Sequence, residues 1–329
     1  IKRIAIWFVS NKLAKKGGWW FAIMFWLSVL ILGCFMSPSV LFVVILPILV
    51  EIFEIAKIEK GEKVGKMLLM GLGFVVSISS GMTPIAHVFP ILAMNSANIA
   101  VGYGEYMLFA IPVGLLCFVL MILMFRFILR PDMSKLKDVD VSQIKENLPK
   151  IDKREIISLV VFVVVILLWV IPSLFKNVSP EFYNFINQYG TAMPPILGTL
   201  ILCIVRVDKK PLIDLNDAFK NGVPWGSLIM CASTLILGSA MTNNNVGLKS
   251  FLQSSLSGSL SGVPAVLLLI IFGLWAMLQT NVSSNMVTAT LVSAVASSII
   301  ASAGIPLNLN AVICIIGMLS AFAFATPPS

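Results

Sequence analysis

Four short polar clusters interrupt the apolar runs of this chain, and their residue types are suited to binding chemistry. In chain order they are Met36-Ser37-Pro38-Ser39, Ser79-Ser80-Gly81-Met82-Thr83-Pro84, Val282-Ser283-Ser284-Asn285-Met286 and Ala325-Thr326-Pro327-Pro328. Clusters of this kind interrupt helices, and a helix end leaves backbone N–H and C=O groups without partners. Unpaired N–H groups at a helix N-terminus attract an anion. Free carbonyls and hydroxyl oxygens suit a hard cation such as sodium.

The elements that hold these clusters belong to a membrane protein. The 329-residue chain is 58% hydrophobic and 12% charged, with a mean hydropathy of +0.99, whereas soluble domains are about 25% charged. Its net charge of +8 comes without a basic patch interleaved with aromatic residues, so we expect the lipid bilayer as a partner and no nucleic acid. The five cysteines lie in apolar runs, at spacings that fit neither a zinc site nor a disulfide framework.

The hydropathy pattern predicts an all-α polytopic membrane protein, because about 20 apolar residues suffice to cross a bilayer. Simple crossings are predicted at 105–129, 156–174, 189–206 and 226–242. Two further segments, 19–56 and 262–303, read as re-entrant helical hairpins that turn at the first and third clusters. Segments 66–100 and 307–329 read as discontinuous helices, broken at the second and fourth clusters. Irregular backbone at membrane depth survives only where protein covers it or it lines a cavity.

The basic residues test this layout. If each hairpin returns to its own side and every other segment crosses once, 21 of the 23 basic residues fall on one face, leaving Lys176 and Lys249 opposite. The positive-inside rule makes the rich face cytoplasmic, which predicts a multi-pass protein of the plasma membrane.

The same layout yields two inverted repeats, because a hairpin followed by a broken helix occurs twice in opposite orientations. Ser37 lies 46 residues before Thr83, and Ser284 lies 42 residues before Thr326. The predicted domains are a first repeat at 1–130, a cytoplasmic linker at 131–155 and a second repeat at 156–329. Inverted repeats whose discontinuous helices meet at the midplane are typical of secondary transporters.

Proton and enzyme chemistry are disfavoured. All fifteen acidic residues lie in loops or near segment ends, and His87 is the single histidine. Proton carriers use an intramembrane carboxylate or histidine; His87 either faces the cavity or bonds a freed carbonyl. An intramembrane enzyme needs two aspartates, a Ser–His dyad or a zinc motif, and no HExxH motif occurs. We therefore predict no catalytic residues and sodium, rather than proton, coupling.

Two of the clusters carry a family resemblance. Ser284-Asn285-Met286-Val287-Thr288 at a hairpin tip, followed by Ala325-Thr326-Pro327-Pro328-Ser329 at a helix break, resembles the divalent anion:sodium symporters of the ion transporter superfamily. The resemblance runs over essentially the whole chain. It implies sodium-coupled symport of small anions, an elevator-type motion and a homodimer. It also implies that about three N-terminal scaffold helices and the end of the last repeat lie outside this sequence.

The resemblance also implies site residues. A sodium ion would be held by Thr280, Ser283, Asn285 and Ala325, and the substrate would meet Ser284, Asn285, Thr326 and Pro327. The counterpart positions in the first half are Ser37, Ser39, Thr83 and Pro84 for the substrate, and Ser37 and Met82 for sodium.

The first half departs from the family pattern. Where a Ser-Asn-Thr tip is expected, the chain has Ser37-Pro38-Ser39, and Met286 replaces a threonine in the second tip. The leading prediction is a carrier of di- or tricarboxylates. The alternatives are a carrier of sulfate or arsenite, a sodium–proton exchanger, an intramembrane enzyme, and a sensor without transport.

Overall fold

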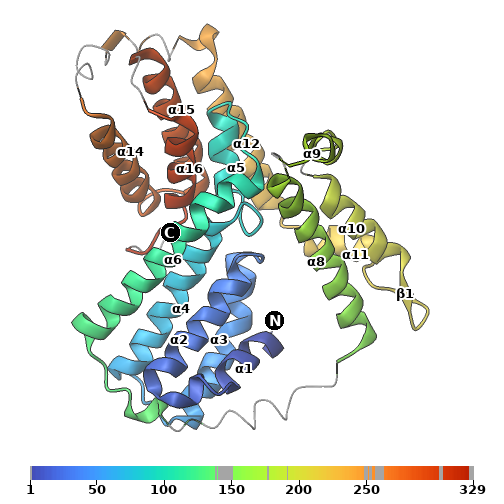
Figure 1. Cartoon of the computed structure of the whole chain (residues 1–329), viewed down its shortest axis with the longest axis vertical. Coiled ribbons are helices and arrows are strands. Elements are labelled where there is room, and N and C mark those ends of the chain that lie inside the picture. The colour runs from blue at the N-terminus through green and yellow to red at the C-terminus, as the bar shows by residue number, and fades with distance from the viewer. Residues whose placement is uncertain are drawn as a thin grey trace. The chain divides into compact units, whose positions relative to one another are not determined.

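The computed structural model describes residues 2–137, 139, 151–175, 178–190, 192–247, 251, 254, 255, 263–303 and 307–325. These residues are almost entirely helical (Figure 1), and the strands among them form one short antiparallel hairpin, β1 (Arg206–Val207) with β2 (Lys210–Pro211). The protein is an all-α polytopic membrane protein, as predicted. Within the described part of the chain, four helical spans are long and apolar enough to cross a bilayer: Pro38–Ile55, Lys63–Met82, Tyr103–Leu129 and Lys153–Pro172.

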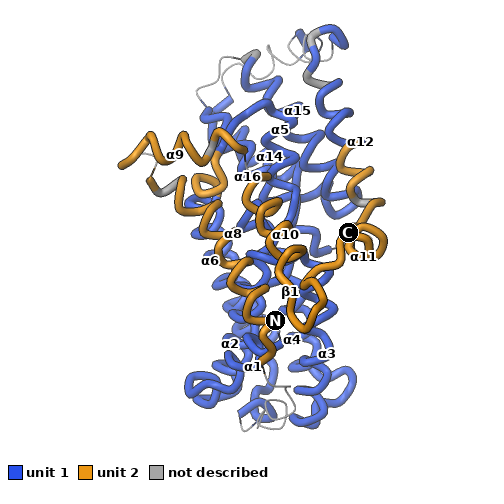
Figure 2. The backbone as a smooth tube through the Cα atoms, turned by 90° about the vertical axis from the view of Figure 1, so that its right-hand side faces the viewer, with its two compact units in different colours: residues 1–101, 107–148, 233–329 blue, residues 102–106, 149–232 orange. Residues whose placement is uncertain are grey.

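The chain forms two compact units, coloured separately in Figure 2. The first unit holds residues 1–101, 107–148 and 233–329, and the second holds 102–106 and 149–232. The predicted site residues all belong to the first unit.

The N-terminal helices of the first unit pack around α2. They are α1 (Lys2–Ser10), η1 (Ala14–Lys16), α2 (Gly18–Gly33), α3 (Pro38–Ile55) and α4 (Lys63–Met82). Trp26 of α2 is fully buried, and its Nε1–H donates to Leu68 O at 3.4 Å. Gly71 of α4 lets the two helices approach, since a Cβ there would collide with the Trp26 ring. Close helix packing through small residues is typical of membrane proteins.

The later helices of the first unit form a second packed group. They are α5 (Phe89–Ser96), the end of α12 (Trp225–Thr242), η5 (Asn244–Val246), α14 (Ala265–Thr280), α15 (Asn285–Ala303) and α16 (Leu309–Leu319). Both α15 and α16 pack against α5. Gly317 allows this approach, because a Cβ at that position would lie 2.9 Å from Pro90 Cα.

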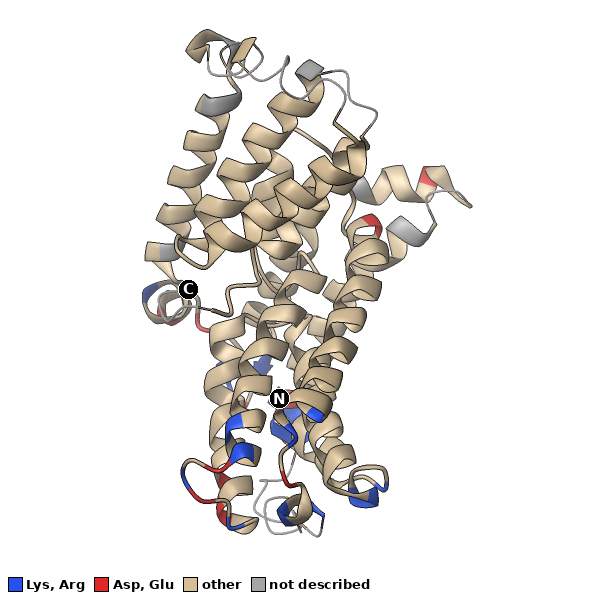
Figure 3. Cartoon of the chain, turned by 90° about the vertical axis from the view of Figure 1, so that its left-hand side faces the viewer, with Lys and Arg blue, Asp and Glu red and all other residues tan. Residues whose placement is uncertain are grey.

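A long helix and a short basic segment complete the first unit. Most of α6 (Tyr103–Met124) belongs here; it continues as the π-helical η2 (Phe125–Leu129) and is followed by η3 (Ser134–Leu136). Lys135 Nζ donates to Lys57 O at 2.9 Å and pairs with Glu62 at 2.5 Å, which ties η3 to the α3–α4 loop. Figure 3 shows the described basic residues of the first unit gathered toward this end. Residues 138 and 140–150 of the predicted linker lie outside the described residues.

The second unit contains the remaining helices. They are α8 (Lys153–Leu174), α9 (Pro180–Asn187), α10 (Met193–Ile204), α11 (Leu215–Asp217), the π-helical η4 (Ala218–Gly222) and the start of α12. Gly198 of α10 packs on Val165 of α8, where an added Cβ would lie 2.7 Å from a valine methyl. Arg154 Nη2 donates to Val207 O at 2.7 Å and so ties α8 to the β-hairpin.

The predicted interruptions are visible as helix ends. Helices α2 and α3 are joined by residues 34–37, here named the first tip, and α14 and α15 by residues 281–284, the second tip. Residues 83–88, the first break, separate α4 from α5. The fourth interruption differs from its predicted position, because α16 ends at Leu319 and residues 320–325, the second break, are already non-helical. Re-entrance and inverted repeats stay predictions.

Candidate functional site

Oxygen atoms of the second tip region and the second break converge on the buried hydroxyl of Thr280. Its Oγ1 lies 2.8 Å from Asn285 Oδ1 and 2.6 Å from Ser320 O. A threonine hydroxyl carries one proton and can donate to only one of these acceptors at a time. The cluster therefore has more lone pairs than protons, which is the arrangement that a small hard cation satisfies.

Asn281 fastens the second tip to the second break. Its Oδ1 accepts from Ala325 N at 2.7 Å, and its Nδ2 donates to Met277 O at 2.7 Å and to Phe322 O at 3.4 Å. These bonds explain why α16 ends early: the side chains of Thr280 and Asn281 engage backbone groups of the break, which therefore needs no further helical turn. Asn281 is not among the residues predicted from the sequence, where the sole indication of its role is an amide side chain directly after α14.

The start of α15 presents backbone donors beside this cluster. The helix begins at Asn285, directly after Ser284, and its first regular bond runs from Thr288 N to Ser284 O at 2.9 Å. The N–H groups ahead of Thr288 have no helical acceptor within α15. Ser283 and Ser284 are half-buried here. The geometry brings predicted residues Thr280 and Asn285 together and places Ser283 and Ser284 next to them in the chain.

The first tip and the first break are linked by a similar side-chain bond. Thr83, only 1% exposed, donates its hydroxyl proton to Cys34 O at the end of α2, and its Oγ1 accepts from Ala86 N at 3.2 Å. Gly33 permits the close approach, since a Cβ there would lie 2.7 Å from Ser79 Cβ. Thr83 thus holds the tip and break together, and Pro84 beside it is buried.

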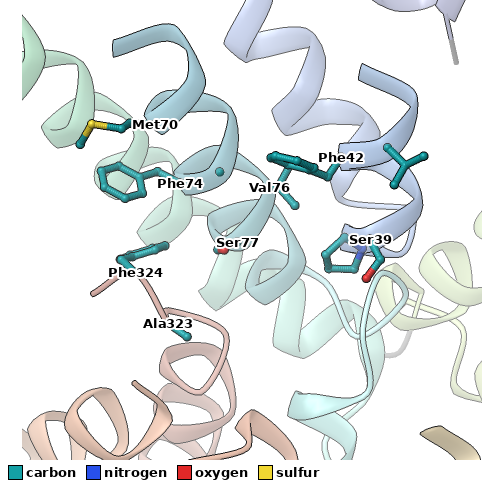
Figure 4. A pocket seen from close by; sticks show the side chains of 11 residues that line it. Ser39, Phe42, Met70, Phe74, Val76, Ser77, Ala323 and Phe324 are labelled. Carbon is teal, nitrogen blue, oxygen red and sulfur yellow. The ribbon is translucent and has the colours of Figure 1, made fainter. Parts of the chain in front are cut away.

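The other predicted residues of the first half lie apart from this bond. Ser37 and Ser39 are exposed, and Ser39 lines a cavity of 570 Å³ (Figure 4). The side chain of Met82 is buried close to Gly114, where an added Cβ would meet it. The sodium site predicted from Ser37 and Met82 stays a prediction.

The two breaks lie close together. A Cβ at Gly81, near the end of α4, would be 3.0 Å from Met318 O and 3.4 Å from a ring carbon of Phe322. The end of α4 therefore packs directly on the point where α16 gives way to the second break. Both interruptions belong to one region of the first unit.

The last predicted residues are described only in part. Thr326 and Pro327 lie outside the described residues. Ala325 is exposed, and its N–H is engaged by Asn281. Its predicted role toward sodium stays a prediction.

His87 has local partners in the first break. Its Nδ1 accepts from Val88 N at 3.0 Å, and its ring lies against Phe89 with a centroid distance of 3.7 Å. Among the residues that the structure describes, no three His, Cys, Asp or Glu side chains gather in a way that could hold a metal ion. The oxygen atoms around Thr280 are neutral and belong to a different kind of candidate site.

The segments that build the site carry no formal charge. No Asp, Glu, Lys or Arg occurs in residues 67–104 or 250–329 of the sequence. An anion bound here has to be stabilised by backbone N–H groups, helix dipoles and a bound cation. The arrangement fits joint binding of a small cation and an anion.

Comparison with known proteins identifies the family of this chain. The family model described as the sodium:sulfate symporter transmembrane region matches residues 2–329. An uncharacterized transporter of Haemophilus influenzae is 22% identical over 331 residues, which cover 98% of this chain and 68% of that protein. Sodium coupling, an anionic substrate and transport rather than catalysis are the general properties of the family. The chain belongs to the sodium:sulfate symporter family, a family of membrane transporters.

Proposed function

We propose that this protein is a secondary transporter that couples the inward movement of sodium to the uptake of a small anion. The observation that carries the proposal is the group of three oxygens formed by Thr280, Asn285 and Ser320 at the start of α15. Family membership supports sodium as the coupling ion. The site offers a cation ligand set and an anion-binding helix end within one turn of each other.

The sodium ion is coordinated by Thr280 Oγ1, Asn285 Oδ1 and Ser320 O in this proposal. Ser283 and Ala325 are the further ligands that the family resemblance predicts. With sodium bound, the Thr280 proton no longer has to be shared between two acceptors. The added positive charge lies next to the N-terminus of α15. Two opposite unit charges about 5 Å apart attract each other by about 3 kcal/mol at an effective dielectric constant of 20.

The anion binds at the N-terminus of α15, against Ser284 and Asn285, with Thr326 and Pro327 completing that half of the site. In the first half, Ser37 and Ser39 face it, while Thr83 and Pro84 support the tip. Thr83 acts mainly as a positioning residue, because both its hydroxyl proton and one of its lone pairs are already engaged. Sodium and anion then raise each other's affinity by the same factor.

Transport follows the layout predicted from the sequence. The two hairpins are re-entrant, the halves 1–130 and 156–329 are inverted repeats, and the protein works as a homodimer by an elevator-type motion. It resides in the plasma membrane with its basic loops in the cytoplasm. The segregation of the described basic residues toward one end of the first unit supports this orientation (Figure 3).

Di- and tricarboxylates are the first substrates to test, and sulfate or arsenite are the alternatives within the same mechanism. Purified full-length protein in proteoliposomes should accumulate a labelled anion only when a sodium gradient points inward. Asn285→Ala should abolish the sodium dependence. Ser298→Ala is the matched control, because the Ser298 hydroxyl bonds only Ala294 O of its own helix.

Two results would contradict the proposal. Proton movement driven by sodium in the absence of any added anion identifies a sodium–proton exchanger. Unchanged anion binding and uptake in Asn285→Ala identifies a protein that does not use this site, such as a sensor.

A further inference from the structure

Two buried hydroxyl groups of α15 have no hydrogen-bond partner within the described part of the chain. Thr288 and Ser293 are both 0% exposed, and neither Thr288 Oγ1 nor Ser293 Oγ donates or accepts a hydrogen bond there. The other hydroxyls that the structure shows buried on this helix each donate to a carbonyl of the preceding turn: Thr290, Ser297 and Ser298. A buried polar group without a partner costs free energy, so each one requires an explanation.

Thr288 lies one helical turn beyond Asn285, on the same face of α15. Residues three apart in a helix are neighbours on its surface, with Cβ atoms about 5–6 Å apart. Helical side chains also lean toward the N-terminus of their own helix, so that of Thr288 leans toward the turn that holds Asn285. Asn285 Oδ1 is one of the oxygen atoms around Thr280. The hydroxyl of Thr288 therefore adds a further oxygen beside the Thr280 cluster.

The C-terminal ends of two helices meet at the same cluster. Thr280 is the last residue of α14, and Ser320 directly follows the last residue of α16. Both helices pack against α15 (Figure 1). A helix C-terminus carries a partial negative charge, and its last carbonyls have no acceptor role within the helix. This side of the cluster therefore favours a cation, whereas the N-terminus of α15 favours an anion.

The three oxygens of Thr280, Asn285 and Ser320 are too few to enclose a hard cation. Calcium and magnesium take about six or more oxygen ligands in proteins. The lone pairs of a hydroxyl that makes no hydrogen bond are free to coordinate an ion. Thr288 can therefore bind a cation without breaking any hydrogen bond of the fold, which is not true of a residue such as Thr83.

We propose that Thr288 Oγ1 is a further ligand of the sodium ion. The proposal rests on the transport function above and extends its sodium site by one turn into α15. Through the ion, α15 would be tied to the end of α14 and to the second break. Ser293 is excluded from this role, because it lies eight residues beyond Asn285, about 12 Å along the helix axis.

The substitution Thr288→Val tests the proposal, because valine keeps the shape of threonine and removes only the hydroxyl. The measurement is the thermal midpoint of the purified full-length protein in detergent, with sodium chloride replacing choline chloride stepwise and no transported anion present. The midpoint rises once sodium exceeds its dissociation constant. In Thr288→Val this rise should begin at about tenfold higher sodium. Thr288→Ala gives the same readout if Thr288→Val does not fold.

Ser293→Ala is the matched control, because it removes the other unpartnered hydroxyl of the same helix. It should leave the onset of sodium stabilisation within a factor of about two. Thr288→Ser keeps the oxygen and should stay within a factor of about three. In the absence of sodium, Thr288→Val and Ser293→Ala should both melt no lower than wild type, because each removes a buried polar group that has no partner.

Four results would overturn the proposal. An unchanged onset in Thr288→Val, when Thr280→Val shifts it, removes Thr288 from the ligand set and leaves the transport function standing. An unchanged onset in both variants removes the proposed sodium site, and Thr288 with it. A shift of equal size in Ser293→Ala assigns the effect to the helix as a whole. A sodium-free midpoint of Thr288→Val below that of wild type shows that the hydroxyl supports the fold instead.

Discussion

The substitution Thr280→Val tests the sodium cluster most directly, because valine keeps the shape of threonine and removes only the hydroxyl. Thr280 is fully buried, and its Oγ1 lies 2.6 Å from Ser320 O and 2.8 Å from Asn285 Oδ1. The change leaves Ser320 O without its buried donor, which costs about 1–3 kcal/mol. It also removes one of the three oxygens proposed to coordinate sodium.

A loss of about 2 kcal/mol in sodium binding corresponds to about a thirtyfold weaker affinity. The assay is anion uptake into proteoliposomes as a function of external sodium. The sodium concentration for half-maximal uptake should rise about thirtyfold, and the maximal rate should recover at saturating sodium. The affinity for the anion, measured at a fixed and low sodium concentration, should fall together with the sodium affinity, because the binding of the two ligands is coupled in this proposal.

Thr290→Val is the matched control. Thr290 of α15 is buried, as Thr280 at the end of α14 is. Its hydroxyl, however, donates to Met286 O within its own helix at 2.9 Å. The control should leave the sodium dependence within a factor of about two. The proposed sodium site is refuted if Thr280→Val lowers the rate of uptake at every sodium concentration without shifting the sodium concentration for half-maximal uptake, since that pattern indicates a purely structural hydroxyl.

Three further predictions concern other contacts of the first unit. Asn281→Ala frees the second break from the second tip and should weaken sodium affinity about tenfold, measured by the same uptake curve; an unchanged curve would show that the break holds its place without this side chain. Gly71→Ala drives a methyl group into the Trp26 ring and should lower stability by about 1–3 kcal/mol, seen as a lower thermal midpoint in detergent; an equal or higher midpoint contradicts the packing. The Lys135 hydrogen bond lowers the pKa of Glu62 below its ordinary value of 4.5, so this pair stabilises the fold above that pH and ceases to do so as the pH falls through the lowered pKa. Lys135→Met should therefore reduce the thermal midpoint at pH 7, and the difference from wild type should shrink as the pH falls through the lowered pKa of Glu62; an equal difference in acid would assign the effect to packing or to the Lys135 bond with Lys57 O.

The sequence predicts the positions of three interruptions well, for a local reason. Pro38 stands in the first turn of α3, where proline is favoured, and Pro84 follows the last turn of α4. Proline marks these two positions together with the neighbouring serines and threonine, because Pro47, Pro112 and Pro172 stand inside helices. The second tip has no proline, yet Ser283, Ser284 and Asn285 mark it because short polar side chains favour turns and helix starts. Local residue chemistry decides all three.

The second break could not be placed from the sequence, because its position depends on tertiary hydrogen bonds. The pair Thr326-Pro327 predicts an interruption there, but α16 ends at Leu319. Thr280 and Asn281, some 40 residues earlier in the chain, bond the backbone of Ser320 and Phe322. No residue near Leu319 predicts the end of α16, because serine and glycine, which stand at Ser320 and Gly317, are also common inside membrane helices.

The cavity shown in Figure 4 could not be predicted from the sequence either, because its lining is brought together only by the tertiary fold. Phe42, Phe74 and Phe324 come from three separate segments, and each has the composition of an ordinary lipid-facing or packing residue. Only their arrangement around Gly73 distinguishes them. A hollow lined by apolar side chains carries no local sequence signal, whereas Ser284-Asn285 at a helix start does.

The segment 320–325 borders both the Thr280 cluster and the cavity, so it would couple the proposed sodium site to any ligand that contacts the cavity. Its backbone oxygens at Ser320 and Phe322 are held by the second tip region, and its side chains at Ala323 and Phe324 form a wall of the cavity. Any shift of this segment that improves the geometry around sodium also moves the cavity wall. A ligand that contacts the wall and prefers the sodium-bound position must therefore tighten sodium binding by the same factor by which sodium tightens its own. Coupling of this kind needs no charged side chain, which agrees with the neutral composition of the segments that build the site.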